Sequence, residues 1–568
     1  MPSSSNEPLT PVPDLLHRIP LSARVVVDVG CGRGDLGGAY RLLNPTARVL
    51  GIEADPAMAA VASTRLNQVV VADPALDFLP LDVPEGVDAF IYSSCLASVD
   101  DPFAVLREHA THLTPDGMML ICVPNIEHWS FAARLLRGNW DYEATGLLDR
   151  QHLRWFSLDS MRKGLVAVGL FPCDVTPRVF DQEQSRAFAT ALTPTLTALG
   201  VDPEDYAKRA APLQYVWRVR KEQRQRMLIG GNMLAPVGGV SHVRVVHPLN
   251  AMATDPSVTT RLTQQIDETP PTDDNPRIFV LHRPALSGDL GRQILRRIMT
   301  GGWMVVTEFD DHPDFFQIMQ DAEQLTFRGV HAVQTSTPAL AEVLRELNPE
   351  VAIFPNAIVS LPEIQNFQSP GAMTLFFGAL NREADWQEHI PVLNELSDRF
   401  GDRLRFQVIH DAGFFEALST SHKAFTPICD YETYQRILSQ CEISFMPLSD
   451  NPFNRGKSDL KFIEAASHRV VPLASTVVYG HSIEDGRTGL LFSNPDELRE
   501  RLARLLAVPD TARQIGDAAR DYVATHRMLA YQVASRVAWY RSLWARRAVL
   551  TQAIEDRLAT PYRPRIRA

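Results

Sequence analysis

Four glycines follow an apolar run near the start of the chain and could bring backbone N–H groups close to a ligand. The run RVVVDVG covers residues 24–30, and the glycines are Gly30, Gly32, Gly34 and Gly37. Glycine permits a sharp turn and a close approach of the backbone to a ligand at a helix N-terminus. The last three glycines also fit the dinucleotide fingerprint G-x-G-x-x-G, so the loop alone leaves the cofactor class open.

Three carboxylates next to this loop favour a cationic nucleoside cofactor over a dinucleotide. Asp28 lies two residues before the first glycine, where it would attract a cation and repel a pyrophosphate. Glu53 ends the second apolar run, where a carboxylate can accept both ribose hydroxyls. Asp73 ends the third run, within reach of an adenine amino group.

Two segments carry a resemblance to methyltransferases. Asp28-Val-Gly-Cys-Gly-Arg-Gly resembles the first motif of class I S-adenosylmethionine-dependent methyltransferases, with Glu53 and Asp73 at the following motifs. GNWDYEATGLLDRQHLRWF, residues 138–156, resembles a signature of proteins related to the ubiquinone-biosynthesis O-methyltransferases. The resemblance covers about residues 20–180 and implies S-adenosylmethionine as the methyl donor. The residues that it implies around this cofactor are Asp28, Gly30, Gly32, Gly34, Glu53 and Asp73.

Methyl transfer from an activated sulfonium depends mostly on alignment, and a general base helps when the acceptor is a hydroxyl. His152, with Asp149 one helical turn earlier, is the first candidate for this base. His128, after the fifth apolar run, is the second. The alternative is that His152 and Arg154 only hold the segment over the sheet by hydrogen bonds.

A second set of charged residues lies in the segment GKSDLKFIEAASHRVVPLAS, residues 456–475. A predicted helix begins after Ser458-Asp459, and its N-terminus could hold a diphosphate. Lys457 and Lys461 would add positive charge, and Glu464 could accept ribose hydroxyls. The alternative is that both lysines are solvated and Glu464 pairs with one of them.

This region resembles the C-terminal domain of GT-B glycosyltransferases of the group 1 type. The matching positions are Lys461, Glu464, Ala465, Pro472, Gly486, Thr488 and Gly489. The resemblance implies a nucleotide-diphosphate sugar as co-substrate, with Asn381 and Arg382 near its phosphates. The loop at residues 235–244 also resembles the glycine-rich loop of the N-terminal lobe in these proteins, which implies that Gly238 and Gly239 lie close to the acceptor and the donor.

One position departs from the pattern of these relatives. Many carry two glutamates separated by seven residues, and the first contacts the donor sugar. Counting back from Glu464, the first position is Gly456. The sugar is therefore recognised by a different contact, or the lobe has lost activity.

Another acidic cluster, Glu308, Asp310 and Asp311, ends an apolar run in the middle of the chain. It could orient an acceptor hydroxyl, bind a metal or cap the next helix, and we favour capping or a structural role. His282-Arg283, also at the end of a run, is a weak catalytic candidate. We expect no metal site.

These residues need rigid elements, and the apolar runs predict them. Short β-branched runs alternate with helical stretches in three series, which is typical of doubly wound parallel sheets. The fold class is α/β: an N-terminal Rossmann-like class I methyltransferase followed by a GT-B fold of two Rossmann-like lobes. We expect an antiparallel edge pair at 171–176 and 213–220, with a helical insertion at 181–211 between them. The predicted domains are residues 1–222, 223–362 and 363–568, with a C-terminal cross-over helix in the last.

Composition limits the partners. The chain of 568 residues has a formal net charge of -11, which argues against nucleic acid as a partner. Six widely spaced cysteines suit a reducing compartment, and no apolar run approaches the length of about 20 residues that a bilayer requires. We therefore expect a cytoplasmic protein. Aromatic residues and arginines in the predicted helix 533–558 suit core packing best, and a peripheral membrane contact second.

The favoured function is that of a bifunctional enzyme that transfers a sugar and O-methylates a glycan or glycolipid acceptor in surface polysaccharide or glycoconjugate biosynthesis. One alternative is a methyltransferase whose GT-B half only binds a glycan. Another is a scaffold with degenerate pockets, and a dehydrogenase comes last. The sequence leaves open the donor base, the sugar, the acceptor, the methylated atom, the stereochemical outcome and the oligomeric state.

Overall fold

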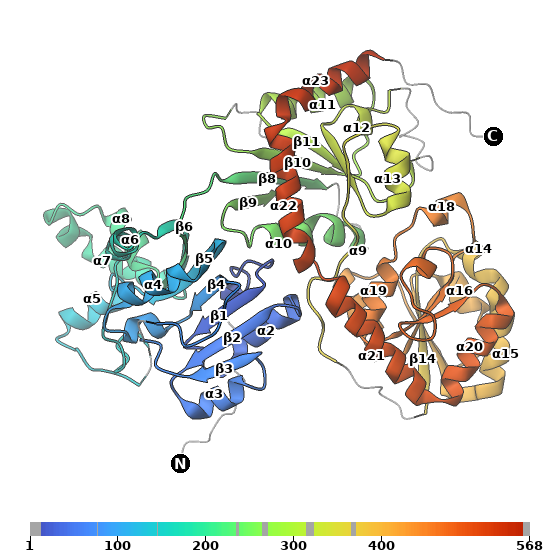
Figure 1. Cartoon of the computed structure of the whole chain (residues 1–568), viewed down its shortest axis with the longest axis horizontal. Helices are drawn as coiled ribbons and strands as arrows, with labels where there is room; N and C mark the ends of the chain where they lie inside the picture. Colours follow the sequence, from blue (N-terminus) through green and yellow to red (C-terminus); the bar gives the residue numbers. More distant parts are fainter. Residues whose placement is uncertain are drawn as a thin grey trace. The chain divides into compact units, whose positions relative to one another are not determined.

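The computed structural model describes residues 13–75, 78–144, 146–233, 238–263, 271–313, 323–364 and 371–560 (Figure 1). These residues form two compact units. The first contains the chain up to Gln225 together with Thr254–Ser257, and the second contains the remainder. The domain boundaries predicted after residues 222 and 362 stay predictions.

The first unit is built on one seven-stranded sheet with the order β3-β2-β1-β4-β5-β7-β6. Its strands are β1 Val25–Val29, β2 Arg48–Glu53, β3 Gln68–Val71, β4 Val87–Tyr92, β5 Leu113–Pro124, β6 Phe171–Arg178 and β7 Gln214–Arg220. The first five are parallel, and β7 runs antiparallel to both β5 and β6. The predicted antiparallel edge pair is therefore confirmed.

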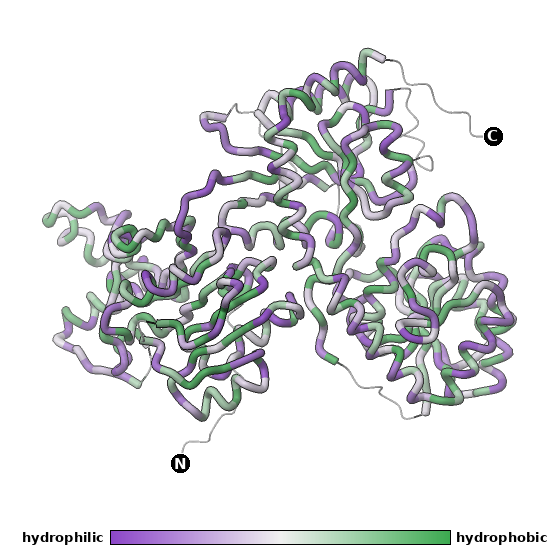
Figure 2. The backbone as a smooth tube through the Cα atoms, in the orientation of Figure 1, coloured by the Kyte–Doolittle hydropathy of each residue, from purple (hydrophilic) through white to green (hydrophobic). Residues whose placement is uncertain are grey.

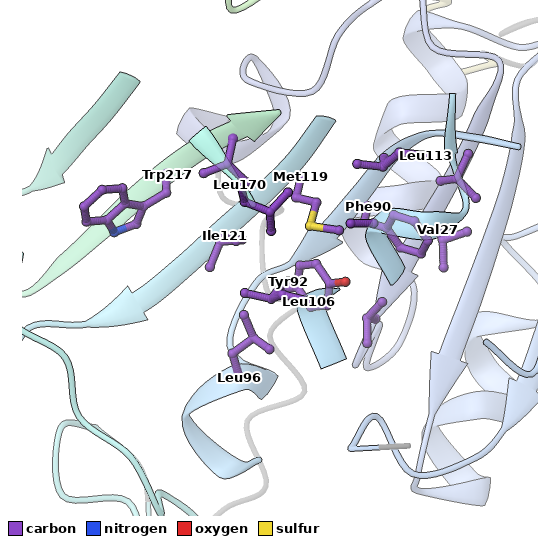
Figure 3. Close-up of a cluster of buried hydrophobic side chains, with 14 of the residues drawn as sticks. Val27, Phe90, Tyr92, Leu96, Leu106, Leu113, Met119, Ile121, Leu170 and Trp217 are labelled. Atoms are coloured by element: carbon purple, nitrogen blue, oxygen red, sulfur yellow. The ribbon is translucent and has the colours of Figure 1, made fainter. Parts of the chain in front are cut away.

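Helices cover the sheet and fill the segment of chain between β6 and β7. They are α1 Pro13–Leu16, α2 Asp35–Leu43, α3 Pro56–Ala62, the 3-10 helix Cys95–Ser98, α4 Pro102–Thr111, α5 Trp129–Leu136, α6 Leu158–Ala167, α7 Gln182–Ala198 and α8 Pro203–Ala210. The last two confirm the predicted helical insertion. Figure 3 shows part of the core, in which Phe90, Met119 and Trp217 contribute buried side chains from three strands.

A short segment far along the chain belongs to this first unit. The Leu21 N–H donates to Thr254 Oγ1 at 2.8 Å, and Arg218 Nη1 donates to the Thr254 carbonyl at 2.9 Å. Arg220 also pairs with Asp255 at 3.2 Å. The chain therefore leaves the first unit after Gln225, returns to it at Thr254–Ser257 and leaves again.

The second unit contains two six-stranded sheets, and we call the parts built on them the first lobe and the second lobe. The first lobe has the strand order β13-β12-β11-β10-β8-β9, and the second has β16-β15-β14-β17-β18-β19. All pairs within both sheets are parallel. The first-lobe strands are β8 Met227–Met233, β9 Val258–Leu262, β10 Arg277–His282, β11 Met304–Glu308, β12 Ala332–Thr335 and β13 Val351–Ile353. The second-lobe strands are β14 Met373–Gly378, β15 Leu404–Ile409, β16 Lys423–Thr426, β17 Ile443–Met446, β18 Val471–Ser475 and β19 Leu490–Phe492.

The helices of the second unit connect these strands. In the first lobe they are α9 Gly238–Ser241, the π-helix His242–Val246, α10 His247–Met252, α11 Gly288–Thr300, α12 Leu325–Arg328 and α13 Pro338–Arg345. The second lobe contains α14 Glu383–Trp386, α15 Ile390–Phe400, α16 Ala412–Ala417, α17 Tyr431–Leu438, α18 Pro452–Arg455, α19 Leu460–Ser467, α20 Pro495–Ala507 and α21 Pro509–His526. Short 3-10 helices lie at Gln387–His389, Gly401–Arg403 and Tyr479–His481.

The chain then crosses back to the first lobe through α22 Ala530–Ala545 and α23 Arg547–Ala559 (Figure 1). The Tyr540 hydroxyl donates to Gln334 Oε1 on β12 at 2.7 Å, and the buried Arg536 guanidinium lies 4.2 Å from the centre of the Phe354 ring. The helix α22 therefore packs against the first lobe, as the preferred interpretation of its aromatic residues and arginines predicts. No helix in the described parts of the chain is long and apolar enough to span a membrane. Figure 2 shows the hydrophobic stretches running along the strands.

Candidate functional site

The glycine loop of the first unit has a backbone that only glycine adopts easily. It connects β1 to α2, and its three glycines have positive φ values: 71° at Gly30, 56° at Gly32 and 74° at Gly34. This left-handed region is strained for residues with side chains. A Cβ added at Gly30 would also lie 2.7 Å from the Cβ of Cys95. The loop therefore requires glycine for its conformation and its packing.

Glu53 holds the same loop from the end of β2. Its Oε2 accepts a hydrogen bond from the Gly32 N–H at 2.7 Å, and its Oε1 accepts one from the Asp55 N–H at 3.0 Å. A Cβ built on Gly32 would have no neighbour within 4 Å, so the space beside the loop is open. Because each carboxylate oxygen can accept a further hydrogen bond, Glu53 still has capacity for ribose hydroxyls.

Asp28, on β1, is buried with a side-chain oxygen that lacks a partner. It is 1% exposed, and its Oδ1 accepts no hydrogen bond from the residues that the structure describes. Burial, with a smaller contribution from Glu53, raises the pKa of Asp28 to about 7. A buried carboxylate without a counterion is unfavourable, and a cation beside it would relieve the cost. The site therefore fits a cationic ligand such as S-adenosylmethionine.

Asp73 lies two residues beyond the end of β3. Its side chain is exposed, and Oδ1 accepts a hydrogen bond from the Ala75 N–H at 2.9 Å. Because β1, β2 and β3 are parallel neighbours, Asp73 follows the same edge of the sheet that carries Asp28 and Glu53. Its contact with an adenine stays a prediction.

The predicted helical turn between Asp149 and His152 is wrong. The chain forms a turn there and continues without helix to residue 156. Asp149 Oδ1 accepts a hydrogen bond from the Gln151 N–H at 2.9 Å, while His152 Nδ1 lies 3.3 Å from the Leu147 carbonyl oxygen. Asp149 closes the turn, a use of aspartate that competes with helix formation, so it does not orient the imidazole.

Backbone contacts hold this segment in place. The N–H groups of Leu153 and Arg154 both donate to the Ala97 carbonyl, at 2.7 and 2.9 Å. The Arg154 guanidinium donates to the neighbouring Leu153 carbonyl oxygen at 3.0 Å and to an exposed Asp100 at 3.4 Å. The segment is therefore pinned by its backbone rather than by the side chains that we expected, and the base role of His152 stays a prediction.

His128 caps a helix. It precedes α5, and its Nδ1 accepts a hydrogen bond from the Ser130 N–H at 3.4 Å and lies 2.8 Å from Ser130 Oγ. Burial lowers the pKa of His128 to about 4, so the ring is neutral near pH 7 and a weak base. This geometry favours the capping role over the predicted catalytic role.

A cavity of about 380 Å³ lies at the carboxyl ends of strands from both lobes of the second unit. Its volume is within the usual range for small-ligand pockets. Five of the seven predicted donor-binding residues line it, namely Gly239, Arg382, Lys457, Lys461 and Glu464. The structure therefore brings together residues that are more than 200 positions apart in the sequence.

Three cations of the second lobe face this cavity. Arg382 Nη1 donates to Asp385 Oδ2 at 3.0 Å and to Asn454 Oδ1 at 2.7 Å. The Lys461 ammonium donates to the Gly378 carbonyl oxygen, at the end of β14. Lys457, before α19, completes the set, and burial lowers the pKa of both lysines. Cations crowded in a partly buried space favour an anionic group such as a diphosphate.

Glu464 lies beside these cations on α19 and is 4% exposed. Its Oε1 accepts hydrogen bonds from the Tyr431 hydroxyl at 2.7 Å and from Gln435 Nε2 at 3.0 Å. Oε2 accepts none from the part of the chain that the structure describes, and burial raises the pKa of Glu464. One carboxylate oxygen is thus positioned and the other is available to a ligand.

The predicted glycine-rich loop at residues 235–244 lies only partly within the described residues. Residues 235–237 lie outside the described residues, and α9 begins at Gly238. A Cβ on Gly239 would lie 2.6 Å from the Tyr431 ring, so glycine is required for this contact between the lobes. Asn381 is exposed with a φ of 54° and forms the turn after β14 without lining the cavity.

Gly456 lies in a place that the first lobe closes. A Cβ added there would be 3.3 Å from Leu340 Cδ2 and 3.8 Å from His312 Cβ, and Gly456 does not line the cavity. The position at which many relatives carry their first glutamate therefore faces the other lobe.

Charged residues of the first lobe form ion pairs around the cavity. Glu308 pairs with Arg244 at 2.8 Å, and both side chains are fully buried. Asp310 accepts a hydrogen bond from Arg283 Nε at 2.7 Å, and Asp311 pairs with Lys457 at 2.6 Å. The structural role that we expected for this acidic cluster is confirmed for Glu308, and the capping role stays a prediction, because residues 314–322 lie outside the described residues.

Sequence reasoning missed Tyr431, whose ring contacts Gly239 and whose hydroxyl binds Glu464. Tyr434, one helical turn later, also lines the cavity. The available signal was a pair of tyrosines three positions apart after Asp430, which caps α17 by accepting a hydrogen bond from the Thr433 N–H. That spacing puts both rings on one helix face.

Comparisons with known proteins match the two units separately. A family model described as a methyltransferase domain matches residues 27–119, and one described as glycosyl transferase-like matches residues 389–537. Trans-aconitate 2-methyltransferase of Methylobacterium nodulans is 33% identical over 135 residues, which are 23% of this chain and 51% of the relative. Its counterpart from Escherichia coli (strain K12 / DH10B) is 30% identical over 124 residues, with 21% and 48% covered. The chain spans about half the length of the curated relatives it matches.

Solved structures also resemble the chain at low identity. Sucrose-phosphate synthase from Thermosynechococcus elongatus gives a TM-score of 0.42 at 16% identity, covering 56% of this chain and 100% of that chain. HepE from Anabaena in complex with UDP-glucose gives 0.41 at 12% identity, with the same coverage. The family models and the sheet topology confirm the predicted fold class, a Rossmann-like methyltransferase domain followed by a glycosyltransferase-like part with two Rossmann-like lobes.

Proposed function

We propose that this chain, which joins a methyltransferase domain to a glycosyltransferase-like domain, is a bifunctional transferase that uses S-adenosylmethionine and a nucleotide-diphosphate sugar. One observation carries the proposal: each unit has a buried carboxylate with one oxygen that accepts no hydrogen bond from the residues that the structure describes. In the first unit it is Asp28, and in the second it is Glu464 beside Lys461. Ligands of α/β folds bind at the carboxyl ends of the strands, and both Asp28 and the cavity that Glu464 lines are found there.

In the first unit the chain's own residues would hold and orient the cofactor. Asp28 would face its cationic part, the loop glycines would leave room beside the backbone, and Glu53 would accept ribose hydroxyls. When bound, S-adenosylmethionine supplies an activated methyl group, so alignment with the acceptor gives most of the rate. His152, half-exposed beside the segment, is our candidate for taking the proton of an acceptor hydroxyl.

In the second unit the same reasoning gives a nucleotide-diphosphate sugar. Arg382, Lys457 and Lys461 would neutralise the diphosphate, and Glu464 Oε2 would accept a ribose hydroxyl. The acceptor that we propose is a glycan or glycolipid of a surface polysaccharide or glycoconjugate, which would be methylated on oxygen by the first unit. We propose the cytoplasm as the location and no nucleic acid partner, in keeping with the acidic net charge.

A second candidate function rests on Gly456. Because this position lacks a carboxylate and faces Leu340, the glycosyltransferase-like half could bind a glycan without turning over a donor. A scaffold in which neither pocket binds its ligand is the third candidate.

One experiment on the full chain separates these candidates. The protein is incubated with S-adenosylmethionine bearing a labelled methyl group, with UDP-, GDP- and dTDP-sugars and with a panel of glycan and glycolipid acceptors, and both methyl incorporation into the acceptor and release of nucleoside diphosphate are measured. The proposal expects both, with Asp28→Asn removing only methylation and Glu464→Gln removing only donor turnover. Methylation without donor turnover would favour the glycan-binding function, and calorimetry without binding of either ligand would favour the scaffold.

A further inference from the structure

Asp310 reaches the cavity from the end of β11 and has no role in the proposed function so far. Arg283 Nε donates to its Oδ1 at 2.7 Å, and His282 Nε2 lies 3.9 Å from the same oxygen. Oδ2 accepts no hydrogen bond from the residues that the structure describes, although Asp310 lines the cavity. Asp310 therefore presents one positioned oxygen and one available oxygen, as Glu464 does in the other lobe.

The surroundings of Asp310 hold it in place. Arg283 has a φ of 46°, a left-handed conformation that is unusual for arginine and persists only where neighbouring contacts impose it. Its Nη2 lies 3.5 Å from Asp311 Oδ2, and Asp311 binds Lys457 at 2.6 Å. Asp310 is thus linked through three successive ion pairs to Lys457, one of the cations that face the cavity.

The charges lining the cavity follow an order. Glu464 lies on the same helix as Lys461 and interacts with it. Lys457, four residues earlier in the chain, connects through Asp311 and Arg283 to Asp310. Among these residues the order is therefore carboxylate, cations, carboxylate. Asp430, which caps α17, and the guanidinium groups of Arg244 and Arg283 line the same cavity.

Asp310 is ionised in this setting. Burial favours the neutral acid, but Arg283, Arg244 and His282 together outweigh it and hold the pKa of Asp310 below its ordinary value. An ionised carboxylate accepts hydrogen bonds from hydroxyls and repels other anions.

We propose that Asp310 Oδ2 binds hydroxyl groups of the sugar that is attached to the diphosphate, and that it limits the donor to neutral hexoses and excludes uronates. This inference rests on the proposed function. A nucleotide sugar presents ribose hydroxyls, a diphosphate and sugar hydroxyls in a row, which matches Glu464, the cations and Asp310. It also accounts for Gly456. Leu340 and His312 of the first lobe lie against that position, and the carboxylate for the sugar comes from the first lobe instead.

The test measures binding to the full-length protein by calorimetry. The probes are UDP, UDP-glucose and UDP-glucuronate, with GDP, GDP-mannose and GDP-mannuronate as a second set. We expect the wild type to bind the neutral sugar nucleotide at least about tenfold more tightly than its uronate, since a close like-charge contact costs several kcal/mol. In Asp310→Asn this preference should fall to within about threefold, while the affinity for the nucleoside diphosphate alone stays unchanged.

Asp273→Asn is the matched control. Asp273 pairs with Arg277 at 3.1 Å at the opposite end of β10 from Arg283, so its removal should leave the preference as in the wild type. If Asp310→Asn does not fold, Asp310→Glu keeps the charge and should keep the preference.

The outcomes distinguish this inference from the proposed function. A wild type that binds neutral and uronate donors equally overturns the inference, and so does an Asp310→Asn variant that keeps the full preference. A variant that keeps the preference but loses turnover with a saturating donor would assign Asp310 to the acceptor instead. A wild type that binds neither UDP nor GDP in any form would contradict the proposed function itself.

Discussion

Asp28 in the first unit and Asp310 in the second both lie at or next to the carboxyl end of a parallel strand, yet only Asp310 has a cation beside it. Arg283 donates to Asp310 at 2.7 Å, and the pKa of that carboxyl is held below its ordinary value. Asp28 has burial and another carboxylate around it, which raise its pKa to about 7. The first site lacks a positive charge that a ligand must bring, whereas the second already holds several.

This difference indicates the charge of each ligand. A pocket with an unpaired buried carboxylate binds a cation most favourably, because the ligand removes an electrostatic cost of the free protein. A pocket with Arg382, Lys457 and Lys461 on its wall gains most from an anion. The two units thus use the same kind of sheet edge for ligands of opposite charge.

The change that should separate the two sites most strongly is Asp28→Asn. Removing the carboxylate should weaken S-adenosylmethionine binding about 100-fold, since the loss of a charged contact in a buried site costs a few kcal/mol. Nucleoside diphosphate binding should not change. Calorimetry with each ligand checks this, and equal weakening of both would break the distinction between the sites.

Lys457→Ala should weaken nucleoside diphosphate binding about tenfold, which corresponds to about 1.4 kcal/mol. The effect should shrink as salt is added, because the lost interaction is electrostatic. S-adenosylmethionine binding is the internal control. An unchanged nucleotide affinity at low salt would remove Lys457 from the site.

The pH dependence should also differ between the sites. Because the pKa of Asp28 is about 7 in the free protein, a cationic ligand must displace a proton below that pH. S-adenosylmethionine affinity should therefore rise about tenfold from pH 6 to pH 8 and level off above it. Titration calorimetry at several pH values checks this, and Asp28→Asn should abolish the rise. A flat profile in the wild type would mean that Asp28 does not face the ligand's charge.

The smallest effect is expected at His128. His128→Ala should lower the free energy of unfolding by about 1 kcal/mol through the loss of a helix cap. Methyl transfer per folded molecule should stay the same, since the structure gives His128 a capping role. His128→Asn, which can still cap, should restore stability. A large loss of turnover in a well-folded His128→Asn variant would return it to the catalytic candidates.

Strands with buried β-branched runs were predictable, because a short and nearly continuous apolar run is typical of a parallel strand covered on both faces. The edge strands β9 and β16 were not, since VTTRL and KAFT are short and partly polar. The glycine loop could also be predicted, because each of its positive φ values needs glycine.

Ion pairs between residues that are far apart in the chain could not be predicted from the sequence. Asp311 and Lys457 are 146 positions apart, and neither spacing nor composition links them. Asp149 and His152 are close in sequence, and a separation of three residues is compatible with both a helix and a turn. The hydrogen bond from the Gln151 N–H to the Asp149 side chain stabilises the turn. Local patterns therefore located the candidate residues, while their partners depended on the folded chain.

The return of the chain to the first unit at Thr254–Ser257 makes this fusion hard to take apart. A clone that stops at residue 222 would omit Thr254, leaving the Leu21 N–H and Arg218 without the oxygens that now accept their hydrogen bonds. A clone that begins at residue 223 would carry those four residues away from their own unit. Neither unit can therefore be exchanged for another domain at a single junction in the gene. Such an exchange would separate Thr254–Ser257 from the rest of the first unit and interrupt the second.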